Sequence, residues 1–182
     1  MRRTVAAIAL LLVSAPANAA GPQITDPAGD ANFSGREAVT APASFAAFDI
    51  RSVRWHADRR FQYVDMTVAG HDPQARTRVH LHAYPSDDTT CGGVRLSWTT
   101  GDRTAAMEGC KPRHVRAYAA PVWSGNTLRF AIPRAALPPW FAAGAVVEHF
   151  AAYLGPYVDF VAGAAYPAAD GALADAHYVV GT

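Results

Sequence analysis

From about residue 50 onwards, apolar and polar residues alternate along the chain in short segments. The alternation is clearest over residues 50–56, 62–68, 78–84 and 128–132. A period of two residues is typical of β-strands that bury one face. The pattern predicts that the following residues point into a core: Val53, Trp55, Val79, Leu81 and Ala83.

Turn-forming residues rich in Gly, Pro, Asp and Asn separate these segments. Further β-like segments cover residues 94–98, 115–122, 146–154, 157–161 and 178–180. A helical turn is predicted only at Arg134–Leu137, after Pro133 ends a strand. We therefore expect an all-β fold, an antiparallel β-sandwich that is jelly-roll-like and has at most one or two short helical turns.

The first 19 residues have the pattern of a secretory signal peptide. Arg2 and Arg3 precede an apolar run from Val5 to Val13, and Ala17-Asn18-Ala19 forms a small-residue cleavage site. The apolar run is shorter than the roughly 20 residues that a transmembrane helix needs. We expect a secreted protein with no membrane span after cleavage. Removing 19 of the 182 residues would leave 163, a single domain at 20–182.

The charge of the expected mature chain is nearly balanced. Without Arg2 and Arg3, 14 of the 16 basic residues remain against 15 acidic residues. Such a chain lacks the basic excess that suits nucleic acids or anionic membranes. We therefore expect no nucleic-acid partner, and we expect a monomer.

The two cysteines, Cys91 and Cys110, flank a predicted hairpin formed by residues 94–98, a turn at Gly101-Asp102 and a return segment. An even pair of cysteines in an exported protein is typical of a disulfide. A bridge here would close a loop of about 20 residues and contribute roughly 3 kcal/mol in the chain-entropy model. We expect this bridge to hold the base of the hairpin together.

Oxygen-bearing side chains gather around one turn near the start of the expected domain. They are Asp26, Asp30, Asn32 and, at the start of the first long strand, Asp49. Calcium takes about six to eight oxygen ligands and tolerates irregular geometry. Pro27 and Gly29 would let the turn direct its oxygens inward. The residues are compatible with a calcium site or with a solvated acidic turn.

Three separate segments carry a resemblance to a known group. They are Asp26–Ala31 together with Phe48–Val53, then Leu128–Leu137, and finally Asp175–Tyr178. They resemble parts of the DOMON-like, carbohydrate-binding-module-9-like β-sandwich domains, which include the C-terminal domains of glucodextranases. Many small exported actinobacterial proteins look similar. The middle of the chain, including the segment between the cysteines, is not covered.

The resemblance implies a jelly-roll-like sandwich with a structural calcium ion. It also implies a role in attachment to glycans or the cell wall, as in the enzyme-attached relatives. Asp26, Asp30 and Asp49 carry over as calcium ligands, with Asn32 and Asp175 as further ones.

His80 and His82 form an alternative metal site. Side chains alternate along a strand, so both imidazoles would lie on one outward face, a spacing that suits zinc or copper. The candidate third ligands are His56, His71, His114 and the Glu148-His149 pair. The other interpretation is that both histidines simply lie on a solvated sheet face.

Trp123 and Trp140 lie at predicted turns and are candidates for ligand binding, because exposed aromatic side chains mark interaction surfaces. The alternative is that they pack against the end of the sandwich. No Gly-x-Ser-x-Gly motif and no set of nucleophile, base and orienting residue is found, so no catalytic residues are predicted.

Taken together, the residues and the resemblance predict a secreted, calcium-stabilised β-sandwich that acts as a binding or envelope-associated module without a catalytic centre. The resemblance implies an extracellular glycan or the cell envelope as its partner. The alternative is a small secreted metal-dependent enzyme with His80 and His82 as ligands.

Overall fold

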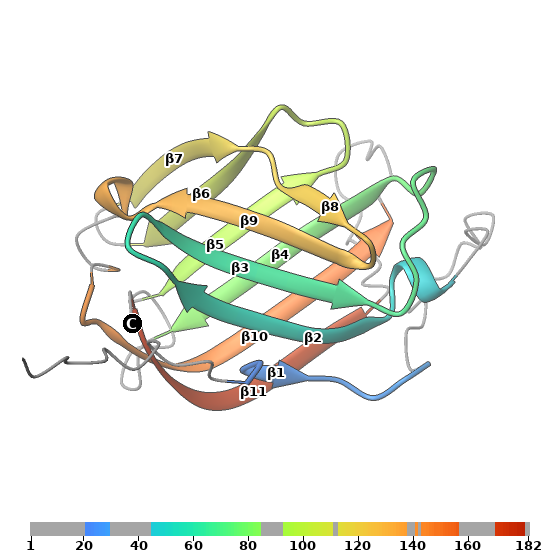
Figure 1. Cartoon of the computed structure of the whole chain (residues 1–182), viewed down its shortest axis with the longest axis horizontal. Helices are drawn as coiled ribbons and strands as arrows, with labels where there is room; N and C mark the ends of the chain where they lie inside the picture. Colours follow the sequence, from blue (N-terminus) through green and yellow to red (C-terminus); the bar gives the residue numbers. More distant parts are fainter. Residues whose placement is uncertain are drawn as a thin grey trace, which may run out of the picture.

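The computed structural model describes residues 21–29, 45–84, 93–110, 113–137, 141, 143–156 and 170–180. Within these ranges, antiparallel strands form two sheets that pack face to face (Figure 1). One sheet has five strands in the order β1-β2-β3-β9-β8, and the other has six in the order β11-β10-β4-β5-β6-β7. The predicted all-β sandwich is confirmed.

The five-stranded sheet consists of β1 (Ile24–Thr25), β2 (Ile50–Ala57), β3 (Phe61–Val68), β8 (Val122–Ser124) and β9 (Thr127–Pro133). The six-stranded sheet consists of β4 (Thr77–Tyr84), β5 (Val94–Thr99), β6 (Thr104–Cys110), β7 (Arg113–Ala119), β10 (Val146–Pro156) and β11 (Asp170–Val179). Two short 3-10 turns are η1 (Phe45–Ala47) and η2 (Arg134–Ala136), the second at the predicted position. In the described ranges, no helix has the length and apolarity that crossing a membrane requires.

The strand alternation correctly identified the core between the sheets. All five residues that the alternation assigned to the core are at most 1% exposed: Val53, Trp55, Val79, Leu81 and Ala83. Trp55 of β2 contacts Phe141 edge-on, with ring centroids 5.6 Å apart, and lies 6.2 Å from the ring of Phe150 in β10. Aromatic packing therefore joins the two sheets at Trp55.

One polar side chain lies at a core-facing position of β3. Gln62 is fully buried, and its Nε2 donates hydrogen bonds to the carbonyl oxygens of His56 (2.8 Å) and Tyr63 (3.1 Å). Its Oε1 accepts a hydrogen bond from the Tyr178 hydroxyl of β11 at 2.8 Å. Gln62 therefore links the two sheets through a satisfied polar contact within the core.

The strand predicted over 115–122 is in fact two strands in different sheets. The first, β7, ends at Ala119 in the six-stranded sheet. The second, β8, begins at Val122 in the five-stranded sheet. Pro121 lies between them and has no N–H with which to continue a ladder. As a result, Trp123 lies in a strand and not in a turn.

The two ends of the described chain also differ from the prediction. The last strand begins at Asp170 and not at Tyr178, because Asp170–Val179 pairs along β10. The lead-in contains β1, which pairs with β2 and lies against β11 (Figure 1). Short or alanine-rich strands of this kind obtain their pairing from neighbours and carry little local signal. The predicted strand at 157–161 lies outside the described residues.

Candidate functional site

The acidic turn folds over the start of β2. The backbone N–H of Asp26 donates to the carbonyl oxygen of Arg51 at 3.1 Å. The N–H of Gly29 donates to Oδ2 of Asp49 at 2.8 Å, and Gly29 has a φ of 75°, which favours glycine. The turn that carries Asp26 is therefore held against the segment that carries Asp49.

Asp49 has an oxygen with no partner in the described part of the chain. The residue is 5% exposed, and its Oδ1 is buried without a hydrogen bond. The Oδ2 atom of Asp26 is also buried. A buried carboxylate oxygen is costly unless a donor or a cation compensates it, so this donor set is compatible with a hard cation such as calcium.

The structure describes only the backbone of one of the other three predicted calcium ligands, Asp175. Asp30 and Asn32 lie outside the described residues. Asp175 lies in strand β11, where its backbone pairs with His149 of β10, and not in a loop before the last strand. Among the described residues, no group of three or more His, Cys, Asp or Glu could hold a metal. Asp26 and Asp49 would therefore be part of a larger ligand set, and calcium stays a prediction.

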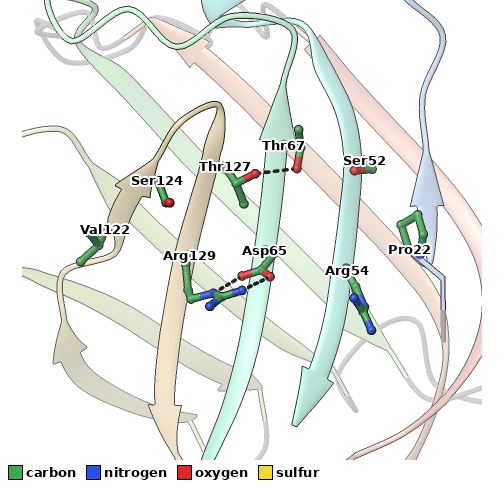
Figure 2. A pocket seen from close by; sticks show the side chains of 9 residues that line it. All are labelled: Pro22, Ser52, Arg54, Asp65, Thr67, Val122, Ser124, Thr127 and Arg129. Carbon is green, nitrogen blue, oxygen red and sulfur yellow. Dashed lines mark hydrogen bonds and ion pairs between the residues drawn. The ribbon is translucent and has the colours of Figure 1, made fainter. Parts of the chain in front are cut away.

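A groove of about 440 Å³ crosses the outer face of the five-stranded sheet (Figure 2). Cross-strand pairing aligns its hydroxyl side chains in one row across four strands: Ser52, Thr67, Thr127 and Ser124. The Oγ1 atoms of Thr67 and Thr127 lie 3.0 Å apart and form a hydrogen bond. The hydroxyl row presents donors and acceptors along the groove.

A row of charged side chains runs beside the hydroxyl row. Arg54 of β2, Asp65 of β3 and Arg129 of β9 are direct cross-strand neighbours. Nε and one terminal nitrogen of Arg129 donate to the two Asp65 oxygens, each at 2.7 Å. His56 Nε2 lies 3.0 Å from Asp65 Oδ2. The charged row therefore contains two guanidinium groups and one carboxylate.

Asp65 is held in its ionised form. Burial raises the pKa of Asp65, but the hydrogen bonds from Arg129 and His56 outweigh that effect and bring its pKa below the usual value.

Arg54 lies beside this pair but does not join it, and its buried Nε makes no hydrogen bond within the described ranges. This groove could not be recognised from the sequence pattern, because alternation shows which residues face outward but not which strands become neighbours.

His80 and His82 both lie on the outer face of the six-stranded sheet, as the strand period predicts. His82 Nδ1 lies 2.6 Å from the Tyr84 hydroxyl, and the His82 ring is edge-on to Tyr153. His80 Nδ1 is buried and has no hydrogen-bond partner in the described ranges. No third His, Cys, Asp or Glu in those ranges joins them in a group that could hold a metal.

The candidate third ligands lie in several places. His56 contacts Asp65 on the other sheet, and His71 stacks on Trp123 with ring centroids 4.1 Å apart. The side chain of His114 is not among the described ones. A metal at His80 and His82 stays an alternative prediction without support from these contacts.

His80 is expected to make the protein less stable in acid. Burial, and then the charges of Arg78, Arg95 and His82, lower the pKa of His80 from 6.5 to about 4, with Glu108 opposing. Between these values the unfolded chain binds a proton that the folded chain does not. The contribution of neutral His80 to the free energy of unfolding is therefore complete above pH 6.5 and is lost as the pH falls towards 4.

Urea unfolding at pH 7 and pH 5 measures this effect. We expect the free energy of unfolding to fall by about 1 kcal/mol through His80, after allowance for solvent screening. His80→Gln should remove this part of the loss, and His71→Gln serves as the control. An equal loss in His80→Gln and in the unmodified chain would contradict the prediction.

Trp123 is half-buried and lines a small pocket of about 180 Å³ at one end of the sandwich, together with Trp98 and His71. Trp140 lies outside the described residues. Cys91 does as well, and Cys110 is the last residue of β6, where it pairs with Arg113. The disulfide therefore stays a prediction.

The groove thus combines a hydroxyl row with a charged row, and its residues come from β2, β3, β8 and β9 and from the lead-in to β1. No protein-family model matches the chain, and no curated protein or solved structure is significantly similar to it.

Proposed function

We propose that this protein is an exported binding module without a catalytic centre and that the groove in Figure 2 is its ligand surface. The observation that carries the proposal is the alignment of four hydroxyl groups beside a charged row. The hydroxyl groups of Ser52 and Ser124 make no hydrogen bond within the described ranges. They are therefore available to a ligand.

An extracellular glycan suits this surface. A saccharide presents many hydroxyl groups, each of which donates and accepts hydrogen bonds. A groove with several convergent polar groups can satisfy them and fix the orientation of the ligand. The predicted resemblance to DOMON-like domains supports the same class of ligand.

The small number of acidic residues in the groove favours binding over glycoside hydrolysis as its function. Hydrolysis by the usual mechanism needs two carboxyl groups that flank the bond. Asp65 is the only acidic residue among the described residues that line the groove. Arg129 and His56 engage its oxygens and its pKa is lowered, which makes it a poor proton donor at neutral pH.

Calcium belongs to the same proposal as a structural ion. Asp49 and Asp26 would hold it at the acidic turn, with the other predicted ligands completing the set. The ion would fix the lead-in segment against the start of β2, the strand that carries the groove residues Ser52 and Arg54.

A substitution that fills the groove tests the proposal. Ser124 is exposed at the groove, so Ser124→Trp should obstruct a bound saccharide with little effect on folding. We expect a glycan-array hit, confirmed by calorimetry, to bind at least about tenfold more weakly to this variant. Thr104→Trp, at an exposed position on the six-stranded sheet, is the matched control and should bind normally.

Two results would contradict the proposal. One is that no array glycan binds the protein in the presence of calcium. The other is that Thr104→Trp weakens binding while Ser124→Trp does not, which would move the ligand surface to the other sheet.

A further inference from the structure

We infer that Arg54 forms an oxyanion subsite in the groove and that the ligand is therefore an acidic saccharide. The inference rests on the proposed function and specifies its ligand class. The oxyanion would be a carboxylate, a sulfate or a phosphate, each of which the planar guanidinium can bind with two parallel hydrogen bonds.

Arg54 is poised to accept a ligand because the protein does not satisfy it. Its Nε is buried, and its guanidinium makes no hydrogen bond or ion pair within the described ranges. A buried N–H without an acceptor costs free energy, whereas an N–H that meets a charged acceptor gains it. Arg54 lines the groove, so a ligand oxyanion there would bind the terminal nitrogens of this unpaired guanidinium.

The neighbouring carboxylate does not take this role. Arg54 and Asp65 are directly opposite each other across β2 and β3. Both oxygens of Asp65 nevertheless bond to Arg129, and one also contacts His56. Figure 2 shows Asp65 joined to Arg129, with no marked contact to Arg54.

The charge of the row favours an anion. With Asp65 ionised, two guanidinium groups face one carboxylate, and no other lining residue in the described ranges carries a charge. The positive excess lies at Arg54, because Arg129 is already paired. A concave surface of one net sign attracts ligands of the opposite sign.

The hydroxyl row indicates that the oxyanion belongs to a larger polyhydroxylated ligand. Ser52 lies two residues before Arg54 on β2, so both face the groove. From Ser52 the row continues across β3 and β9 to Ser124 in β8. A sugar whose oxyanion binds Arg54 could therefore place hydroxyl groups along the neighbouring row.

Calorimetric titrations with four probes test the inference. The probes are a uronic-acid tetrasaccharide, a sulfated tetrasaccharide, a neutral hexose tetrasaccharide and inorganic phosphate. We expect one of the acidic tetrasaccharides to bind at least tenfold more tightly than the neutral one, and which of them binds identifies the oxyanion. Its affinity should fall as salt rises.

Two arginine variants that each remove one positive charge distinguish binding at Arg54 from a general electrostatic attraction by the protein. Arg54→Gln should weaken the acidic tetrasaccharide about tenfold or more, whereas Arg59→Gln, in the exposed turn after β2, should change it less than twofold. Arg54→Lys, which keeps the charge but lacks the planar fork, should bind with intermediate affinity. Arg54→Gln should melt at or above the temperature of the unmodified protein, because the variant lacks the buried Nε that has no acceptor.

Each alternative outcome decides a different question. Equal binding of the acidic and neutral tetrasaccharides, unchanged in Arg54→Gln, would overturn the oxyanion subsite but leave the groove as the ligand surface. Phosphate that binds as tightly as either acidic tetrasaccharide would overturn the saccharide part. Acidic binding that Ser124→Trp leaves unchanged would overturn the proposed function itself.

Discussion

Removal of calcium is expected to lower the melting temperature of this protein by about 5–10 °C. A ligand present at about 100 times its dissociation constant stabilises the folded state by about 2.7 kcal/mol. In a chain of this size, each kcal/mol corresponds to about 2–4 °C. The physical reason is Asp49, whose buried Oδ1 has no hydrogen bond in the described part of the chain. Thermal melts in calcium and in chelator measure the difference.

Asp49→Asn sharpens this test. The variant lacks the buried negative charge, so we expect it to lose the calcium response and to melt in chelator at or above the temperature of the unmodified protein. Asp102→Asn, at an exposed position after β5, should keep the full response. A calcium shift that persists in Asp49→Asn would exclude Asp49 as a ligand. A shift produced by zinc or copper alone would instead direct attention to His80 and His82.

Gln62→Leu is expected to lower the free energy of unfolding by about 2–4 kcal/mol. The substitution has nearly the same volume, so the cost comes from lost hydrogen bonds and not from a cavity. It would remove the Gln62 Oε1 that accepts from the Tyr178 hydroxyl and the Nε2 that donates to the carbonyl oxygen of His56. Urea unfolding at neutral pH measures the loss.

A double-mutant cycle isolates the link between the sheets. Tyr178→Phe removes the hydroxyl that donates to Gln62, and the double variant removes both partners. We expect the double variant to be more stable than the sum of the two single losses predicts, with a coupling of about 1 kcal/mol. Strict additivity would mean that the Gln62–Tyr178 hydrogen bond contributes nothing to the packing of one sheet on the other.

The two outer faces of the sandwich have different chemistry. The five-stranded sheet carries the groove, with its hydroxyl row and the uncompensated Arg54. The six-stranded sheet carries His82, which contacts Tyr84 and Tyr153. Because His82 already has these partners, its imidazole is less available to a ligand than the Arg54 guanidinium.

The sequence by itself determined the long alternating strands, β2, β3, β4 and β9, and the side that their residues face. The two-residue period identified Val53, Trp55 and Leu81 as core residues, and all three are buried. This succeeded because alternation is a local property of an extended chain and does not depend on which strand lies alongside. The oxygen-bearing residues were also visible in the sequence, at the turn that carries Asp26 and at the strand start that carries Asp49, but only the fold brings these two segments into contact.

Only the tertiary structure decided which strands became neighbours, and with them the groove. Asp65 and Arg129 are 64 residues apart in the chain, and Gln62 and Tyr178 are 116 residues apart. A hairpin turn can fix the pairing of strands that follow one another, such as β2 and β3. The pairing of β3 with β9, however, depends on how the two sheets bury their apolar faces against each other. That choice aligned Arg54, Asp65 and Arg129 in one row, and no local pattern in the sequence encodes it.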